Sequence, residues 1–329
     1  MLPVFILALM TVLALSTLIA VFTNSLIIVV NLIDKAKGKH FSPSDLIVVT
    51  LCISNIIFQF TMLINDYMSF IESDVYFTDE VYTVSVVFLI LPIYSSFWFT
   101  VCLSINYYLQ IVISTHPVLI RLKLAGSQLI PPLIMASLFI SLATGLPAAW
   151  NIYRDPLELN ISNNESEEAS YPKLSTAYLL PSNLVSCSLP LVLVGVANGL
   201  IIKSLVTKTH KSDRNAKGEM SARAEGRVRA ARTISCLLIL YISFYVAEIL
   251  VFIEVFPQSS PEFCACLVVI YGYSPAQSIV LIFGSPKLKQ VFVTIFLYCT
   301  GGINKGKPRT PTVLFIKLKE KKNVHFPKE

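Results

Sequence analysis

Apolar residues fall into seven long runs along the chain, and short polar segments separate these runs. A helix of about 20 residues spans the roughly 30 Å hydrocarbon core of a bilayer, and every run reaches that length. The pattern therefore predicts an all-α membrane protein that is a bundle of seven transmembrane helices. The runs cover approximately residues 4–31, 46–68, 81–112, 127–149, 178–202, 230–256 and 263–284.

We expect residues 1–290 to form this bundle and residues 291–329 to form a basic tail. The first run has no basic segment before it and is longer than the apolar region of a signal peptide, about 7–15 residues, so we expect it to remain as a span. The composition agrees, because only 14% of the residues are charged, against about 25% in soluble domains. The mean hydropathy is +0.68.

The net charge of the connecting segments alternates in sign along the chain. Segments 32–44, 69–80, 113–126, 150–177, 203–232 and 254–262, and the tail from residue 286, carry +2, −4, +2, −3, +6, −2 and +8. Basic segments stay in the cytoplasm, so the N-terminus is predicted outside and the tail inside. The basic charge thus indicates orientation and contact with membrane lipids, not a nucleic-acid partner.

Two glycosylation sequons, beginning at Asn160 and Asn164, lie in the longest acidic loop, which the charge pattern places outside. We therefore expect both asparagines to be glycosylation sites and the protein to follow the secretory route to the plasma membrane as a multi-pass protein.

The seven cysteines show neither the spacing of metal ligands nor a Cys-x-x-Cys pair. We expect buried thiols, with Cys299 either a palmitoylation site or a free thiol. The sequence also contains no nucleophile with a matching base and no nucleotide-binding loop. No enzyme activity, metal or cofactor is therefore expected.

Five residues stand out within the apolar runs. Asn24 and Asn55 are interpreted as hydrogen-bonding links between the first, second and seventh spans. Pro190 is expected to kink the fifth span, and Asp66 is expected to be hydrated at the outer end of the second. Glu248, in the outer half of the sixth span, has two open interpretations, a ligand contact or a side chain that snorkels to the interface.

Several segments, in order and spacing, resemble the taste receptor type 2 family, the bitter taste receptors, which are seven-helix G-protein-coupled receptors. The likeness extends from Asn24 to Gln290. The chain differs from rhodopsin-like receptors because it has no Asp-Arg-Tyr sequence after span three and no Asn-Pro-x-x-Tyr sequence in span seven. Neither the outer end of span three nor the loop 150–177 has a cysteine, so the disulfide that usually joins these two segments in rhodopsin-like receptors cannot form. The matching segments are Leu51–Asn55, Trp98–Ile111, His116–Pro117, Ile202–Leu205 with His210, Ala230–Tyr241 and Gln277–Gln290.

The resemblance implies that a small-molecule agonist binds in the outer half, between spans three, five, six and seven. Leu89, Ile93 and Leu267 stand where family members use polar or aromatic residues, so this cavity is expected to be unusually apolar. The remaining polar or aromatic groups in it are Tyr94, Phe244, Tyr245, Glu248 and Tyr271.

The resemblance also implies a cytoplasmic cleft that binds a heterotrimeric G protein. Its predicted residues are Tyr107, Gln110, His116, Arg227, Arg232, Lys287 and Lys289. The basic segments have a second interpretation, contact with anionic lipids, worth about 1 kcal/mol for each Lys or Arg near the surface.

Two other classes of protein share part of the pattern. A vomeronasal-type or other seven-helix receptor shares the layout but not the matching segments. A transporter or channel requires a continuous polar path through the bundle, which a few scattered acids do not supply.

Overall fold

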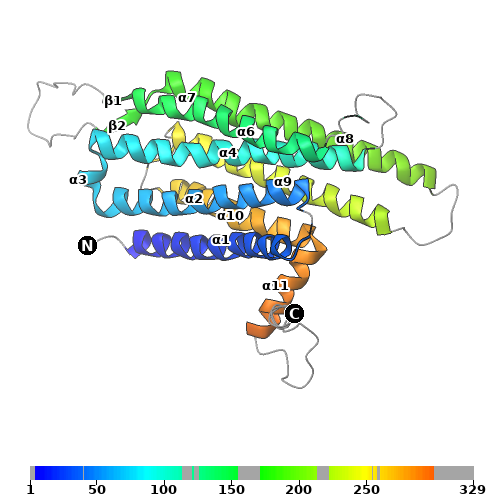
Figure 1. Cartoon of the computed structure of the whole chain (residues 1–329). Helices are drawn as coiled ribbons and strands as arrows, with labels where there is room; N and C mark the ends of the chain where they lie inside the picture. The colour runs from blue at the N-terminus through cyan, green and yellow to red at the C-terminus, as the bar shows by residue number, and fades with distance from the viewer. Residues whose placement is uncertain are drawn as a thin grey trace, which may run out of the picture. The chain divides into compact units, whose positions relative to one another are not determined.

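Seven membrane-length helices lie side by side in the computed structural model, which describes residues 4–39, 41–112, 121, 126–154, 171–212, 222–253, 255–257 and 260–299 (Figure 1). The predicted seven-helix all-α class is confirmed within these residues. The spans are Leu7–Ala36, Pro43–Ile71, Asp79–Ile111, Gln128–Trp150, Thr176–Leu205, Glu225–Phe252 and Pro261–Gly284.

Five of the spans are single α-helices, and two are composites. The single helices are α1 (Val4–Ala36), α2 (Pro43–Ile71), α4 (Asp79–Ile111), α9 (Ala222–Phe252) and α10 (Pro261–Gly284). The fourth span joins α6 (Gly126–Gly145) to the 3₁₀ turn η1 (Leu146–Trp150). The fifth joins α7 (Thr176–Asn183), the π-helical turn η2 (Leu184–Ser188) and α8 (Leu189–Ser212).

The spans form a closed ring around a shared core. Helix α1 packs against α2 and α10, α2 against α4, α4 against α8, α8 against α9, and α9 against α10. Helix α4 contacts α6 as well, and 72% of its most apolar stretch is buried, more than in any other span. The third span is therefore the central helix of the bundle.

Local sequence sets the start of α2. Ser42 Oγ accepts a hydrogen bond from the Asp45 amide, and an Asp45 carboxylate oxygen accepts one from the Ser42 amide. This reciprocal capping box satisfies two donors that a helix start would otherwise leave unpaired, and Pro43 needs no donor there.

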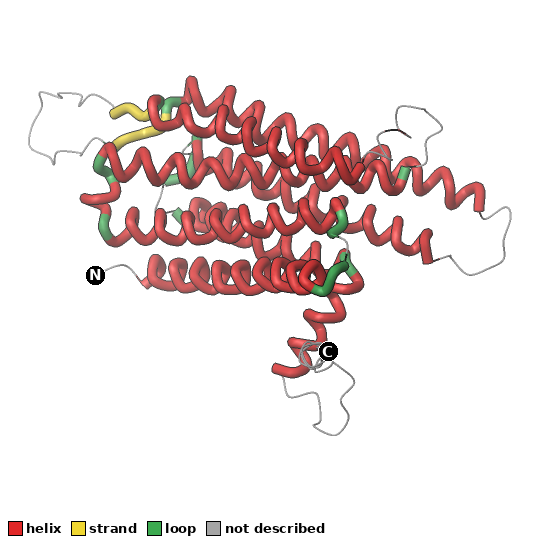
Figure 2. The backbone as a smooth tube through the Cα atoms, in the orientation of Figure 1, coloured by secondary structure: helices red, strands yellow, loops and turns green. Residues whose placement is uncertain are grey.

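A short antiparallel hairpin marks one end of the bundle, which we call the hairpin end (Figure 2). It consists of β1 (Ile152–Arg154) and β2 (Pro172–Leu174), with Tyr153 opposite Lys173. Arg154 Nε lies 2.7 Å from an oxygen of Asp79, the first residue of α4, and its Nη2 donates to the Phe77 carbonyl. These contacts hold the hairpin against the start of the third span.

The short helix α3 (Ser73–Tyr76) connects the second and third spans at the hairpin end. The ring of Tyr76 packs edge-on against those of Phe77 and Tyr82, and its hydroxyl donates to Asn65 Oδ1 at 2.7 Å. Burial raises the pKa of Tyr76, so this hydroxyl stays a hydrogen-bond donor at neutral pH.

Buried amides connect the first, second and seventh spans. Asn55 Nδ2 donates to Gln277 Oε1 at 2.7 Å and to Asn24 Oδ1 at 3.3 Å, and Asn24 Nδ2 donates to Ser274 Oγ. All four residues are almost completely buried. The predicted linking role of Asn24 and Asn55 is confirmed.

Pro275 in α10 creates a further link. Proline has no N–H, so the carbonyl of Tyr271, four residues earlier, lacks its usual partner inside the helix. Gln59 Nε2 of α2 donates to this carbonyl at 2.9 Å, and Ser16 Oγ of α1 donates at 3.1 Å. The hydrogen-bond donor that α10 lacks at this carbonyl is thus supplied by the two helices that pack against it.

The close approach of α9 and α10 depends on a glycine. A Cβ atom at Gly284 would lie 2.5 Å from Thr233 Oγ1, a distance at which one of the two residues must shift. The absence of a side chain at Gly284 therefore allows the sixth and seventh spans to touch.

The chain divides into two compact units, residues 1–284 and 285–329. The first ends slightly before the boundary at 290 that we expected. The second contains helix α11 (Pro286–Cys299), whose start is capped by Ser285: its carbonyl accepts from the Lys289 amide at 2.9 Å.

We predict that Gln59→Leu lowers the free energy of unfolding by about 1–2 kcal/mol, because the Tyr271 carbonyl loses a buried donor. Thr61→Val on the same helix should have little effect, since Thr61 bonds only its own helix. Thermal unfolding of the purified protein in lipid nanodiscs measures both.

Pro275→Ala provides a double-mutant test of the same explanation. Alanine restores the N–H that the Tyr271 carbonyl lacks, so Gln59→Leu should cost less in the Pro275→Ala background. Equal costs in both backgrounds would contradict the assignment of Gln59 to this carbonyl.

Candidate functional site

The predicted ligand residues gather in one apolar cluster toward the hairpin end of the bundle. In this cluster Phe97 stacks on Tyr241 with ring centroids 4.0 Å apart, and the ring of Phe244 lies 4.7 Å from that of Tyr273. The buried members are Ile93, Tyr94, Phe244, Leu267 and Tyr271, with Leu89 and Tyr245 packed against them.

Tyr94 joins the third span to the fifth. Its hydroxyl donates toward Asn183 Oδ1 at 2.9 Å and Ser182 Oγ at 3.1 Å, at the end of α7. The Cys187 thiol also lies 3.6 Å from Asn183 Oδ1. The side chain of Asn183 is therefore the acceptor on which this part of the site is centred.

Glu248 faces the interior of the bundle. Only 3% of the residue is exposed, which excludes the interpretation that it snorkels to the interface. Among the described residues, three buried side-chain polar atoms have no hydrogen-bond partner, and two of them are the carboxyl oxygens of Glu248. The Cys187 thiol and the hydroxyls of Tyr94 and Tyr241 lie near enough to the Glu248 carboxyl group to interact with it electrostatically.

An unpartnered acid in this position is costly. Burying a charge or an unpaired polar group away from water raises the free energy of the folded state by several kcal/mol. Native proteins rarely leave such a group unsatisfied without a functional reason. Glu248 is therefore the principal candidate for a polar contact with a ligand.

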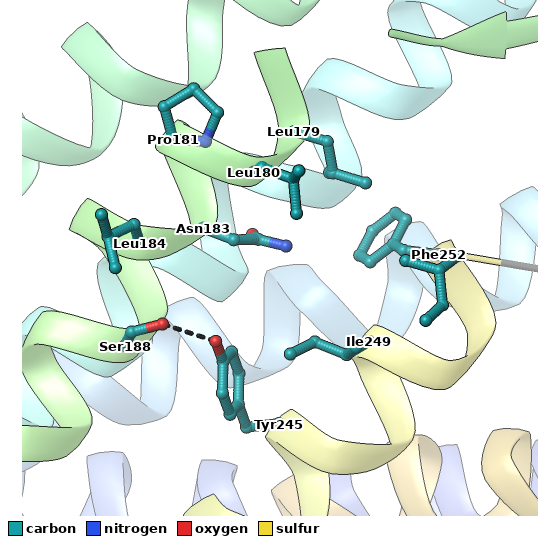
Figure 3. Close-up of a pocket in the computed structure, with 10 residues that line it drawn as sticks. Leu179, Leu180, Pro181, Asn183, Leu184, Ser188, Tyr245, Ile249 and Phe252 are labelled. Carbon is teal, nitrogen blue, oxygen red and sulfur yellow. Dashed lines mark hydrogen bonds between the residues drawn. The ribbon is translucent and has the colours of Figure 1, made fainter. Parts of the chain in front are cut away.

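The described part of the chain contains a pocket of about 490 Å³ between the fifth span and α9 (Figure 3). Its deep end is closed by a hydrogen bond between the hydroxyls of Ser188 and Tyr245. The fifth span contributes Leu179, Leu180, Pro181, Asn183, Leu184 and Ser188. Helix α9 contributes Tyr245, Ile249 and Phe252, and Ile253 follows directly after its end.

Of the predicted ligand residues, Tyr245 alone lines this pocket. Sequence reasoning missed Asn183 and Ser188. The signal available was the polar sequence around Asn183 in an otherwise apolar run, shortly before Pro190. Asn183 is the last residue of α7 and Ser188 is the last residue of the π-helical turn η2, and both line the pocket.

Asp66 differs from our expectation of a hydrated side chain. Only 6% of it is exposed, and its Oδ2 accepts a hydrogen bond from the Tyr271 hydroxyl at 2.7 Å. The reason is that α10 covers this turn of α2, and the pair then satisfies both polar groups away from water. Both the hydroxyl and the carbonyl of Tyr271 are thus bonded to neighbouring helices.

At the opposite end of the bundle, α4 and α9 meet in a second apolar cluster. Tyr107 packs there with Ile111 and Ala231, so Arg227 and Arg232 lie within one helical turn of the contact. Gln110 is exposed, and its Nε2 donates to Ser44 Oγ at 3.2 Å.

The structure thus brings Tyr107 together with the part of α9 that holds the two predicted arginines. His116, Asn160 and Asn164 lie outside the described residues. Lys287 and Lys289 lie on the first turn of α11.

The six cysteines whose side chains are described all carry free thiols, and Cys264 and Cys266 form no disulfide. No cluster of three or more His, Cys, Asp or Glu side chains able to hold a metal ion occurs in the described ranges.

Seven membrane-spanning helices, six of them in a closed ring and α6 packed against α4, surround an aromatic interior with a buried acid toward one end, and this is the architecture of a seven-helix membrane receptor. The family profile of the taste receptor proteins, TAS2R, matches residues 1–300.

Taste receptor type 2 member 40 of Gallus gallus is 28% identical over 86% of this chain and 92% of its own length. Member 119 of Mus musculus is 31% identical over 86% of this chain and 82% of its own. Member 9 of Homo sapiens is 24% identical over 89% of this chain and 94% of its own length.

The chain belongs to the taste receptor type 2 family, as its sequence motifs suggested. It is a bitter-taste receptor of the G-protein-coupled class, a multi-pass plasma-membrane protein and not an enzyme. Receptors of this family bind small molecules and couple to G proteins. Membership also excludes the vomeronasal-type receptor, transporter and channel classes.

We predict that Tyr271→Phe lowers the free energy of unfolding by about 1–3 kcal/mol, because a buried Asp66 oxygen loses its donor. Tyr67→Phe is the matched control, since Tyr67 follows Asp66 in the chain but is 49% exposed. Thermal unfolding in nanodiscs compares the two. If both variants unfold at the same temperature, Asp66 is hydrated as we first expected.

Proposed function

We propose that this receptor binds its agonist in the interior at the hairpin end, between the third, fifth, sixth and seventh spans. The observation that carries the proposal is the buried carboxyl group of Glu248, which has no hydrogen-bond partner among the described residues. The walls around it are the predicted apolar and aromatic residues, Leu89, Ile93, Tyr94, Phe244, Tyr245, Leu267 and Tyr271.

The chemistry of this region favours agonists that are largely apolar and carry a hydrogen-bond donor. Apolar walls contribute affinity without direction, whereas a single polar anchor fixes the orientation of the bound molecule. A protonated amine or a hydroxyl group satisfies a carboxyl group that is otherwise unpaired. Charge-assisted hydrogen bonds of this kind are stronger than neutral ones.

Several hydrogen bonds connect this region to the fifth span, and two of them are especially suited to transmit binding. Tyr94 of α4 bonds Asn183, and the Tyr241 hydroxyl of α9 donates to the Cys187 carbonyl at 2.7 Å. Cys187 lies in the π-helical turn just before Pro190, where the helix is irregular. An agonist that binds one arrangement of these contacts more tightly than the other shifts the receptor toward it.

The proposed output is a surface at the opposite end that binds a heterotrimeric G protein. Packing of Tyr107 next to the segment that holds Arg227 and Arg232 supports the proposal for these residues. Gln110 and His116 are proposed with them. Lys287 and Lys289 of α11 are proposed separately as further contacts with the G protein, because basic side chains match an acidic partner surface.

The orientation of the receptor is part of the proposal. The alternating loop charges support a hairpin end outside the cell and a basic third inner loop and tail inside. Asn160 and Asn164 are then expected to be glycosylated, since both lie between β1 and β2 in the sequence.

We predict that Glu248→Gln weakens amine-bearing agonists about 10–100-fold, because a charge-assisted hydrogen bond is lost. Uncharged apolar agonists should keep their potency. The measurement is a calcium-flux screen of a bitter-compound panel in cells that express a taste-type G-protein chimera.

Glu262→Gln is the matched control, since Glu262 is an exposed acid in the first turn of α10. It should change neither class of agonist. An equal loss of both classes in Glu248→Gln would assign the residue a structural role. Uniform silence of the unsubstituted receptor, despite surface expression, would count against the agonist proposal itself.

We also predict that glycosidase treatment of the receptor from animal cells increases its electrophoretic mobility. The shift should become smaller in Asn160→Gln and in Asn164→Gln and disappear in the double variant. Surface labelling of intact cells with an antibody to an N-terminal tag tests the orientation separately, and labelling only after permeabilisation would contradict it.

A further inference from the structure

The pocket between the fifth span and α9 has features that the proposed agonist site does not explain. The pocket lies on the lateral surface of the bundle, whereas Glu248 faces the interior of the bundle. Its rim residues Leu180, Leu184 and Ile253 are 61%, 63% and 50% exposed. In a membrane-spanning protein these apolar side chains face the hydrocarbon of the bilayer, so the pocket opens toward lipid.

The interior of the pocket is apolar apart from a few groups. Its lining contains no charged residue. The hydroxyls of Ser188 and Tyr245 bond each other and so are already occupied. A molecule that enters this pocket gains apolar contact but meets no partner for a charge, which selects uncharged ligands.

One polar group does point into the pocket. Asn183 is 7% exposed, and its carbonyl oxygen accepts from the Tyr94 hydroxyl, which orients the amide. Its nitrogen makes no hydrogen bond to any described residue and is directed toward the space between Leu180 and Ile249 (Figure 3). The nitrogen thus offers a hydrogen-bond donor to an otherwise apolar pocket, which favours a ligand that carries an acceptor.

Size and position limit the ligand further. A volume of about 490 Å³ lies within the range of small-molecule pockets, roughly 300–1,000 Å³. The lining extends from Leu179 to Ser188 along the fifth span, which is about 15 Å at the helical rise of 1.5 Å per residue. The pocket therefore occupies the half of the span at the hairpin end, within one leaflet.

We propose that this pocket is a second binding site, which takes an uncharged apolar molecule from the bilayer and holds it by one carbonyl-type acceptor on the Asn183 amide. The amide oxygen of Asn183 at the same time holds Tyr94 of the third span. An occupant of the pocket is thus connected to the interior site by a single side chain. The proposal does not depend on contact between Glu248 and an agonist.

The test uses the purified full chain in phosphatidylcholine nanodiscs and tritiated androstanone, a rigid apolar skeleton with a single ketone. Androstane, the same skeleton without the ketone, is the competitor. We expect saturable binding of androstanone, and competition by androstane about five- to tenfold weaker than by unlabelled androstanone, because it lacks one hydrogen bond.

Leu184→Trp blocks the rim and should weaken androstanone binding at least tenfold. Leu193→Trp is the matched control, since Leu193 is an exposed leucine of α8 that does not line the pocket, and it should bind as the unsubstituted receptor does. Ile253→Trp blocks the pocket from α9 and replaces Leu184→Trp if that variant does not fold.

Asn183→Leu should make androstanone and androstane compete equally, and Glu248→Gln should leave both unchanged. Equal binding by Leu184→Trp and Leu193→Trp, or no saturable binding to the folded receptor, would overturn the site. Equal competition by the two compounds in the unsubstituted receptor would overturn the role of the amide. Loss of agonist response in Glu248→Gln with intact androstanone binding separates this site from the proposed agonist site.

Discussion

Pro275 lacks an N–H, and the carbonyl of Tyr271 therefore has no partner within its own helix. No water is available to it in a bilayer, so other helices must supply the donor. Gln59 and Ser16 do so, and this requirement sets how α1 and α2 lie against α10. The amides of Asn24, Asn55 and Gln277 obey the same requirement one turn away. The first, second and seventh spans are thus held together by polar groups that have no alternative partner.

The opposite side of the bundle is organised differently. There the fifth span is interrupted by a π-helical turn, and the third and sixth spans contact it through Tyr94 and Tyr241. The buried carboxyl group of Glu248 has no hydrogen-bond partner among the described residues, and the Asn183 amide nitrogen is directed into the pocket between the fifth span and α9 (Figure 3). In one half of the bundle the buried polar groups are hydrogen-bonded, and in the other half some are not. This division suits a receptor, because a ligand binds where polar groups still need partners. The free energy lost at Glu248 is recoverable by a ligand.

Much of the fold could be predicted from the sequence, since a membrane span is recognised from the length of an uninterrupted run of apolar residues. The predicted spans agree with the observed helices to within a few residues at most ends, and the family motifs led to the correct family. The site was predictable only in part. The side chains inferred from the family do form one cluster, but the hydrogen bond of Asp66 to Tyr271 and the role of Asn183 were not foreseen. Asp66 and Tyr271 are 205 residues apart, and no local pattern pairs them.

The amino-acid sequence by itself determined the number of spans, the charge pattern of the loops and the family, because each depends on composition over short windows or on ordered motifs. It also marked the polar residues that need partners. Only the tertiary structure decided which partners they find, and it left Glu248 without one while burying Asp66 against Tyr271. The physical reason is that a hydrogen bond between spans depends on which faces of two helices meet. The sequence of one helix does not specify which face of a neighbouring helix is turned toward it.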